Sequence, residues 1–395
     1  MHCFLMSLSL AVAGLWAVSH GLPAVAQDGP PAVVAEERAA PAPAATAKYP
    51  TPPHVELTGH TADLWGATFS PDGKRAVTIS SDKTARIWDV ATGATLLTLS
   101  GHDEAVRTAA FSPDGTLLAT ACRNGKAKLW NTASAALIAD LEGHPEMVES
   151  IAFSPDGLKV VTSSRDATAR VWDGKTGALI ATLSGHTEWL SGAEFSPDSK
   201  KVVTSSSDKT AKVWDAATGK LELTLEGHDG LVTSVIFSPD GSHIATSSSD
   251  KTARIWTAAD GKSVVSVAGH TRAALRVAFS GDGKRFVTSS SDKTLKVWDA
   301  QSGALLATMQ GVHKRLIPRV MFSPDGRFVA SASHDKTAAV WDAVTGEALA
   351  ILKGHTKEVD QAQFSPDGTK VLTASFDRTA RIWDISSFAG GAAKP

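Results

Sequence analysis

The sequence contains very little cysteine and tyrosine, and its positive and negative charges nearly balance. Its 395 residues include two cysteines and one tyrosine, and the formal net charge at pH 7 is −2. One cysteine, Cys3, lies in a segment predicted below to be removed, which leaves Cys122 without an intramolecular disulfide partner. Two cysteines also exclude a cysteine-rich zinc site. The balanced charge argues against a general nucleic-acid binder.

Long hydrophobic runs are missing after the N-terminus, so no membrane span is predicted. Near the N-terminus, an apolar stretch from Phe4 to Val18 is followed by Ala24-Val25-Ala26, which fits a small-x-small cleavage site. We therefore predict a signal peptide over residues 1–26 and a periplasmic or secreted protein. No Lys or Arg precedes the apolar stretch, and a cytosolic adaptor that keeps this segment is the alternative.

Two further segments lack the composition of a folded domain. Residues 27–53 are rich in alanine and proline, which predicts a disordered linker. Residues 388–395 end in Gly-Gly-Ala-Ala-Lys-Pro and are predicted to form a flexible tail. The folded part is therefore expected to span residues 54–387.

This folded part consists of one unit repeated eight times. A histidine, which follows glycine in seven of the units, recurs every 42 residues, apart from one inserted residue at Val312. A tryptophan keeps the same spacing. The histidines are His60, His102, His144, His186, His228, His270, His313 and His355, and the tryptophans are Trp88, Trp130, Trp172, Trp214, Trp256, Trp298, Trp341 and Trp383.

Each unit has the pattern of four short strands separated by turns. In the first unit the expected strands are 64–69, 75–80, 84–88 and 95–99, and Ser70-Pro71-Asp72-Gly73 is a typical turn between the first two. A small four-stranded sheet with two apolar faces is not stable alone. A radial arrangement buries both faces against neighbouring sheets and leaves short edges.

A Gly-His pair followed by Asp 22 residues after the histidine, and then by Trp-Asp, resembles the WD-repeat family of β-propellers, here of an exported bacterial type. The resemblance implies a buried hydrogen-bonded tetrad of His, Thr, Asp and Trp in each blade, because polar groups without access to water must satisfy one another. In the first and fourth units the tetrads are His60, Thr78, Asp82 and Trp88, and His186, Thr204, Asp208 and Trp214. Asn124 replaces the aspartate in the second unit, so the interaction with His102 loses its charge.

The resemblance also implies how the ring closes. Residues 54–58 match the strand that precedes each later Gly-His, and the repeats stop after the third strand of the last unit, at Trp383-Asp384-Ile385. The N-terminal strand is therefore expected to complete the last blade. The fold class is an all-β, eight-bladed propeller of four-stranded antiparallel blades; seven blades and a spare unit are the alternative.

No motif for catalysis, a cofactor or a metal is found in the repeats. His60, Thr78 and Asp82 could be mistaken for a nucleophilic triad, but such a triad needs an exposed hydroxyl and is normally present once. The histidines show no metal-ligand spacing, and there is no phosphate-binding loop. We predict a protein that is not an enzyme and has no cofactor. The alternative is a small-ligand binder or enzyme that uses the central channel, where Glu194 and Gln363 interrupt small or apolar positions.

Three positions in each unit are predicted to project from one loop face of the propeller. They are the third and fifth residues after the histidine and the residue before the aspartate. Aromatic, Met and Arg side chains, which are enriched at interface centres, occur among them. Arg107, Arg123 and Arg165 form one basic sector, and Arg272, Arg276, Lys314, Arg315 and Arg319 form another.

This face predicts a scaffold that binds a protein or peptide partner as a monomeric ring, and ordinary scatter of apolar surface is the alternative. The predicted contact residues are Trp65, Arg107, Arg123, Met147, Glu149, Arg165, Trp189, Leu231, Leu275, Leu316, Arg319, His334 and Phe376.

Overall fold

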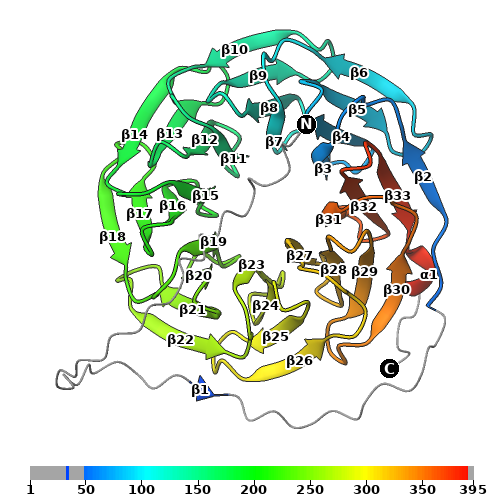
Figure 1. The fold of residues 1–395 in the computed structure, drawn as a ribbon. Helices are drawn as coiled ribbons and strands as arrows, with labels where there is room; N and C mark the ends of the chain where they lie inside the picture. Colours follow the sequence, from blue (N-terminus) through cyan, green and yellow to red (C-terminus); the bar gives the residue numbers. More distant parts are fainter. Residues whose placement is uncertain (1–32, 35–48, 390–395) are drawn as a thin grey trace, which may run out of the picture. The chain divides into compact units, whose positions relative to one another are not determined.

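The computed structural model describes residues 33–34 and 49–389, and these form an all-β ring of eight blades (Figure 1). The predicted signal peptide, most of the predicted linker and residues 390–395 lie outside the described residues. Each blade is an antiparallel sheet of four strands, with one strand near the centre of the ring and one at its rim. The predicted fold class is therefore confirmed. In the described part of the chain, no helix is long and apolar enough to cross a membrane.

The first four blades follow one another along the chain, and their strands run from the centre outward. Blade 1 contains β3 (Leu64–Phe69), β4 (Arg75–Ser80), β5 (Ala85–Asp89) and β6 (Thr95–Leu99), and blade 2 contains β7 (Val106–Phe111), β8 (Leu117–Cys122), β9 (Ala127–Asn131) and β10 (Leu137–Leu141). Blade 3 contains β11 (Val148–Phe153), β12 (Lys159–Ser164), β13 (Thr168–Asp173) and β14 (Leu179–Ser184), and blade 4 contains β15 (Leu190–Phe195), β16 (Lys201–Ser206), β17 (Ala211–Asp215) and β18 (Leu221–Leu225).

The remaining blades continue around the ring. Blade 5 contains β19 (Val232–Phe237), β20 (His243–Ser248), β21 (Thr252–Thr257) and β22 (Ser263–Ala268), and blade 6 contains β23 (Ala274–Phe279), β24 (Arg285–Ser290), β25 (Leu295–Asp299) and β26 (Leu305–Met309). Blade 7 contains β27 (Arg319–Phe322), β28 (Phe328–Ala332), β29 (Ala338–Asp342) and β30 (Ala348–Leu352), and blade 8 contains β31 (Val359–Phe364), β32 (Lys370–Ser375), β33 (Ala380–Asp384) and β2 (His54–Leu57). The two-residue strand β1 (Val33–Val34) pairs in parallel with β22.

Blade 8 closes the ring with strands from both ends of the repeat region. Strand β2 pairs with β33 in antiparallel register, with His54 opposite Trp383 and Leu57 opposite Ala380. The chain just before β2 is also held, because the carbonyl oxygen of Pro53 accepts a hydrogen bond from the backbone N–H of Asp384 at 2.9 Å. The predicted closure is confirmed. Pro53, the last residue of the predicted linker, thus bonds to blade 8.

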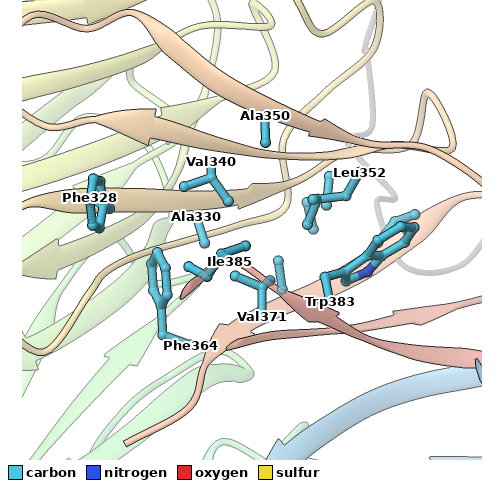
Figure 2. Close-up of a cluster of buried hydrophobic side chains, with 13 residues drawn as sticks. Phe328, Ala330, Val340, Ala350, Leu352, Phe364, Val371, Trp383 and Ile385 are labelled. Carbon is cyan, nitrogen blue, oxygen red and sulfur yellow. The ribbon is translucent and has the colours of Figure 1, made fainter. Parts of the chain in front are cut away.

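The hydrophobic core lies between successive blades. Figure 2 shows one such interface, in which Phe328 and Val340 of blade 7 face Phe364 and Trp383 of blade 8. Phe388, in the short helix α1 (Ser386–Ala389), packs against the same cluster. Phe388 is also the first residue of the predicted tail, most of which lies outside the described residues. Each blade is stabilised by burying apolar surface against both neighbours, as a radial arrangement requires.

Candidate partner-binding face

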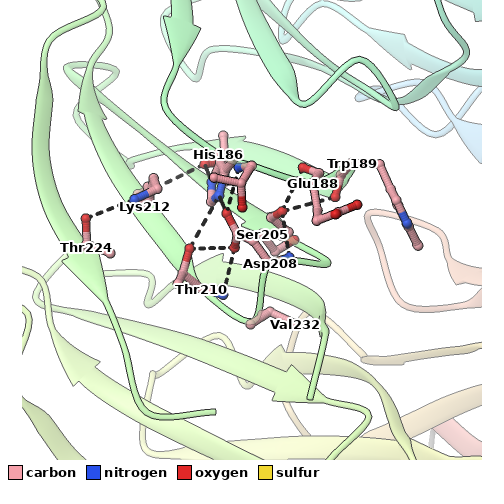
Figure 3. A network of polar contacts seen from close by, with 12 residues as sticks. His186, Glu188, Trp189, Ser205, Asp208, Thr210, Lys212, Thr224 and Val232 are labelled. Atoms are coloured by element: carbon pink, nitrogen blue, oxygen red, sulfur yellow. Dashed lines mark hydrogen bonds and ion pairs between the residues drawn. The ribbon is translucent and has the colours of Figure 1, made fainter. Parts of the chain in front are cut away.

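A chain of hydrogen bonds links the repeated histidine of each blade to the two middle strands of that blade. In blade 4, the indole N–H of Trp214 donates to Thr204 Oγ1 at 2.8 Å. His186 lies 2.8 Å from Thr204 through Nε2 and 2.7 Å from Asp208 Oδ2 through Nδ1 (Figure 3). Because a carboxylate can only accept, the imidazole proton belongs on Nδ1, and the threonine hydroxyl donates to Nε2. Burial lowers the pKa of His186, which favours this neutral form.

The corresponding contacts in blade 1 have nearly the same lengths. His60 lies 2.7 Å from Asp82 and 2.8 Å from Thr78, and Trp88 donates to Thr78 at 2.8 Å. The hydroxyl of Thr78 is fully buried and takes part in two hydrogen bonds. These contacts support a structural role for the threonine, since a nucleophile needs an accessible hydroxyl.

The tetrad holds two loops at one edge of each blade. One loop carries the histidine, and the other carries the aspartate in the tight turn between the second and third strands. In blade 1, Asp82 also accepts a hydrogen bond from the N–H of Thr61, beside the histidine, and from the N–H and hydroxyl of Thr84. We call the ring surface formed by these two sets of loops the His–Asp face.

Blade 2 departs from this arrangement. Asn124 accepts hydrogen bonds from the Cys122 thiol and the Lys126 backbone N–H, and it makes no bond to His102. Nδ1 of His102 is consequently buried without a hydrogen-bond partner among the described residues. Burial, helped by Lys128, lowers the pKa of His102 to about 4. The sequence predicted the loss of a charge here, whereas the structure lacks the whole interaction. Cys122 itself is buried and forms no disulfide bond within the described part of the chain.

The predicted contact positions come together on the His–Asp face in every blade. The carbonyl oxygen of the third residue after the histidine accepts a hydrogen bond from the N–H of the residue before the aspartate, or before Asn124 in blade 2. In chain order the pairs are Asp63 with Ser81, Ala105 with Arg123, Met147 with Arg165, Trp189 with Ser207, Leu231 with Ser249, Ala273 with Ser291, Leu316 with His334 and Glu358 with Phe376, at 2.9 to 3.2 Å.

The fifth residue after the histidine lies at a β-bulge in the innermost strand. The register between β3 and β4 shifts from Leu64 to Gly66, so Trp65 has no direct partner on β4. Six other blades share this shift, and in blade 7 Pro318 takes the position immediately before β27. A bulge changes the direction of a side chain relative to a regular strand. This feature was not predicted from the sequence.

Four blades contribute to an aromatic–arginine cluster made of His334, Asp360, Phe376, Trp65 and Arg107. The Trp65 ring packs edge-on against Phe376, with centroids 4.8 Å apart, and the Arg107 guanidinium lies 3.7 Å from the Trp65 centroid. The Trp65 indole N–H donates to Ser81 Oγ at 2.7 Å. His334 contacts both the Phe376 ring and, at 3.3 Å, Asp360. The contacts fix Trp65 on both sides of its ring.

A second group lies on the neighbouring blades 3 and 4. Arg165 forms an ion pair with Glu149, and its guanidinium lies 5.5 Å from the Trp189 ring centroid. The ring of Trp189 is turned away from the tetrad of its own blade (Figure 3). Glu149 also favours the charged form of Arg107, which connects this group electrostatically to the aromatic–arginine cluster.

The other predicted contact residues differ in exposure. Arg123 is exposed, and Leu231, Leu275 and Leu316 are half-buried. Met147 has a relative exposure of only 8%, so the prediction that its side chain projects from the loop face is wrong. The sequence pattern could not show this burial, because it places the backbone of Met147 on the face without fixing the direction of its side chain.

The second predicted basic sector divides into two parts. Arg272, Lys314 and Arg315 are exposed outside the ring centre. Arg319 instead lines a cavity of about 210 Å³ together with Trp65, Arg107 and Gln361. This cavity lies where the His–Asp face meets the central channel, the space between the eight innermost strands. Gln361 is a lining residue that the sequence analysis did not identify.

The two polar residues expected in the channel have different environments. Gln363 accepts a hydrogen bond from the backbone N–H of Phe69 at 3.0 Å and so links blade 8 to blade 1. Burial raises the pKa of Glu194 to about 8, which keeps its carboxyl largely protonated at neutral pH. The two residues lie in different blades, 4 and 8, and the amide of Gln363 is neither an acid nor a base.

Comparisons with known proteins agree with this geometry. The family model described as "WD domain, G-beta repeat" matches residues 51–89, 93–131, 135–173, 177–215, 219–257, 261–299, 303–342 and 346–384. The crystal structure of the computationally designed Ika8 protein superposes with a TM-score of 0.75 at 29% identity, over 84% of this chain and 98% of that one.

Curated relatives match over a much shorter stretch. The serine-threonine kinase receptor-associated proteins of Homo sapiens and Bos taurus are each 44% identical over 41 residues, which is 10% of this chain and 12% of the relative. That length corresponds to about one repeat. The family match, in contrast, covers all eight blades, and members of this family generally act as protein-interaction scaffolds. The chain belongs to the WD domain, G-beta repeat family.

Proposed function

We propose that this protein is a non-catalytic scaffold that binds a protein or peptide partner on the His–Asp face. The observation that carries the proposal is the aromatic–arginine cluster, in which side chains from blades 7, 8, 1 and 2 meet around Trp65. Aromatic and arginine side chains contribute most to binding when they are held rigidly at the centre of an interface. Trp65 meets this condition because the Phe376 ring, the Arg107 guanidinium and a hydrogen bond to Ser81 fix its position.

The buried tetrads also favour this function, because they make the His–Asp face rigid. They hold the loops of the His–Asp face in place with buried hydrogen bonds, so little conformational entropy remains to be lost when a partner binds. The adjoining ion pair between Arg165 and Glu149, next to Trp189, extends the face across blades 3 and 4. Together the two groups place aromatic and charged side chains on six of the eight blades.

The test compares partner capture by the native protein and a variant that combines Trp65→Ala, Arg107→Ala and Trp189→Ala. Affinity capture from the native host followed by mass spectrometry identifies proteins retained by the native ring, and these should be lost from the variant. The matched control combines Leu96→Ala, Leu179→Ala and Leu221→Ala, which removes exposed apolar side chains from outermost strands. Capture should be unaffected in the control. Equal capture by the native protein and the triple variant, with both folded by thermal unfolding, would refute the proposal.

We also propose that the protein works in the periplasm or outside the cell. The basis is the sequence of residues 1–26, with its apolar stretch and small-x-small site. N-terminal sequencing of the protein from its host is the direct test, and a mature chain that begins at Gln27 is the expected result. A chain that still begins at Met1 would support the cytosolic adaptor instead.

A further inference from the structure

In four blades, the sixth residue after the histidine lines the mouth of the channel. Gly66, Thr108, Arg319 and Gln361 hold this position in blades 1, 2, 7 and 8, and all four line the cavity described above. Arg276 holds the equivalent position in blade 6, next to Arg319 along the ring. Among the eight equivalent residues, Arg276 and Arg319 are the two that carry a charge. Two neighbouring blades therefore bring their guanidinium groups close enough together to interact electrostatically.

These guanidiniums have few anionic partners. Among the described residues, no carboxylate oxygen lies within 4.0 Å of a guanidinium nitrogen of Arg276, Arg319 or Arg107. In addition, Nε of Arg107 is buried without a hydrogen-bond partner. Two carboxylates lie nearby: Glu149 pairs with Arg165, whereas Asp360 contacts His334 and also interacts electrostatically with Arg319 and Arg107. A single carboxylate is thus left to balance three guanidinium groups.

The arginines also disfavour one another's charge. Burial and the nearby Arg319 lower the pKa of Arg276, while Asp360 and Glu149 act in the opposite direction. Like charges held together in a partly buried place destabilise a protein unless an ion of opposite charge compensates them. The mouth therefore contains an excess of positive charge that a bound anion would neutralise.

We propose that Arg276, Arg319 and Arg107 form an oxyanion-binding site at the channel mouth, which takes an acidic group of the partner held on the His–Asp face. The partner chemistry is thus an acidic peptide segment, presenting a carboxylate or a phosphate. Guanidinium groups suit such anions because their N–H groups form charge-assisted, bidentate hydrogen bonds to two oxygens. The Gln361 side chain, which lines the same cavity, offers a further donor. This assignment rests on the proposed function.

The test uses two probes and two double variants of the full chain. The probes are inorganic phosphate and an acetylated, amidated hexaglutamate peptide, with hexaglutamine of the same length as the uncharged control. The channel variant combines Arg276→Gln with Arg319→Gln. Its matched control combines Arg272→Gln with Lys314→Gln, which removes two exposed positive charges outside the channel.

Hexaglutamate and phosphate should raise the unfolding temperature of the native protein and of the matched control, but not that of the channel variant. The affinity for hexaglutamate should fall at least tenfold in the channel variant. Without any anion, the channel variant should unfold at a higher temperature than the native protein, because a repulsive pair has been removed. Equal stabilisation of the native protein and the channel variant by hexaglutamate would overturn the site. Stabilisation by phosphate alone would overturn the peptide assignment.

The experiment separates this site from the proposed function. Loss of partner capture in the Trp65, Arg107 and Trp189 variant, without any anion effect at Arg276 and Arg319, would overturn the anion site and leave the scaffold standing. A clear anion effect with undiminished partner capture by the triple variant would support the anion site and refute the proposed docking face.

Discussion

Replacing Asn124 with aspartate should stabilise the protein, because it restores the one tetrad that is incomplete. In the other blades, aspartate Oδ2 lies 2.7 to 3.1 Å from the histidine Nδ1. In blade 2, Trp130 donates to Thr120 and Thr120 contacts His102 Nε2, so the imidazole proton lies on the unpartnered Nδ1. Asn124→Asp supplies the missing acceptor for His102 Nδ1–H. Its other carboxylate oxygen can still accept the hydrogen bonds that Asn124 now accepts from the Cys122 thiol and the Lys126 backbone N–H.

The magnitude follows from two terms. A hydrogen bond to a charged group contributes about 1.5–3 kcal/mol, and a buried unsatisfied group costs about 1–3 kcal/mol. Desolvation of the new carboxylate offsets part of this gain, so we expect the free energy of unfolding to rise by about 1.5 kcal/mol. Domains of 150–250 residues shift by about 2–4 °C per kcal/mol and larger ones by less, so the unfolding temperature should rise by about 2 °C.

The pKa of His102 provides a second readout. Its value of about 4 lies below the unfolded value of 6.5, so its contribution to stability is complete above pH 6.5 and is lost as pH falls toward 4. Asn124→Asp should raise the pKa of His102, as followed by its imidazole NMR signals, and reduce this acid sensitivity. Asp82→Asn is the reverse control and should destabilise blade 1. An Asn124→Asp protein that is no more stable than the native one, with the pKa of His102 still about 4, would refute the reasoning.

Three further predictions concern the framework of the ring. Gly125→Ala should lower the free energy of unfolding by about 3 kcal/mol, since its new Cβ would lie 2.1 Å from the His144 carbonyl oxygen. Gly311→Ala should lower it by only about 1 kcal/mol, because nothing lies within 4 Å of the new Cβ and only the positive φ is unfavourable. Equal losses for the two variants in chemical denaturation would contradict this. Deletion of residues 54–57 should lower the unfolding temperature strongly, because it removes the outermost strand of blade 8 and the buried Leu57. An unchanged unfolding temperature, together with a closed ring in solution scattering, would show that β2 is dispensable. The native protein should lose stability as pH falls below 6.5, because burial lowers the pKa of several tetrad histidines and the unfolded chain then binds more protons than the folded one. An unfolding temperature that does not change between pH 4 and pH 6.5 would exclude this mechanism.

The architecture could be predicted from the sequence because residues with a specific structural role recur at the same place in every repeat. Tryptophan and histidine at a fixed period identify the blades, and the match of residues 54–58 to the other outer strands identifies the closure. In blade 1, three of the four strands have the predicted bounds. The third begins one residue later than predicted, because the Thr84 hydroxyl bonds to Asp82 and belongs to the turn.

The candidate site was less predictable because side-chain direction depends on backbone irregularity. The bulge in the innermost strand holds residues as different as Trp65, Arg107 and Leu275, so no residue type signals it. Without the bulge, the sequence could place Trp65 and Arg107 on one face but could not show that they stack. For the same reason it grouped Arg276 with exposed basic residues, although Arg276 occupies a channel position.

The closure of blade 8 has a consequence for how the protein acquires its fold. Glu56 in β2 and Arg381 in β33 form an ion pair across 325 residues of chain. Strand β2 is synthesised before the other strands of the eight blades, so it has no partner until nearly all of the repeats have been made. The entropy of closing so long a loop is then lost in a single late step. A chain released before β33 would present an unpaired strand and an uncovered apolar sheet, which are the features that promote aggregation. Complete synthesis is thus a condition for a soluble product.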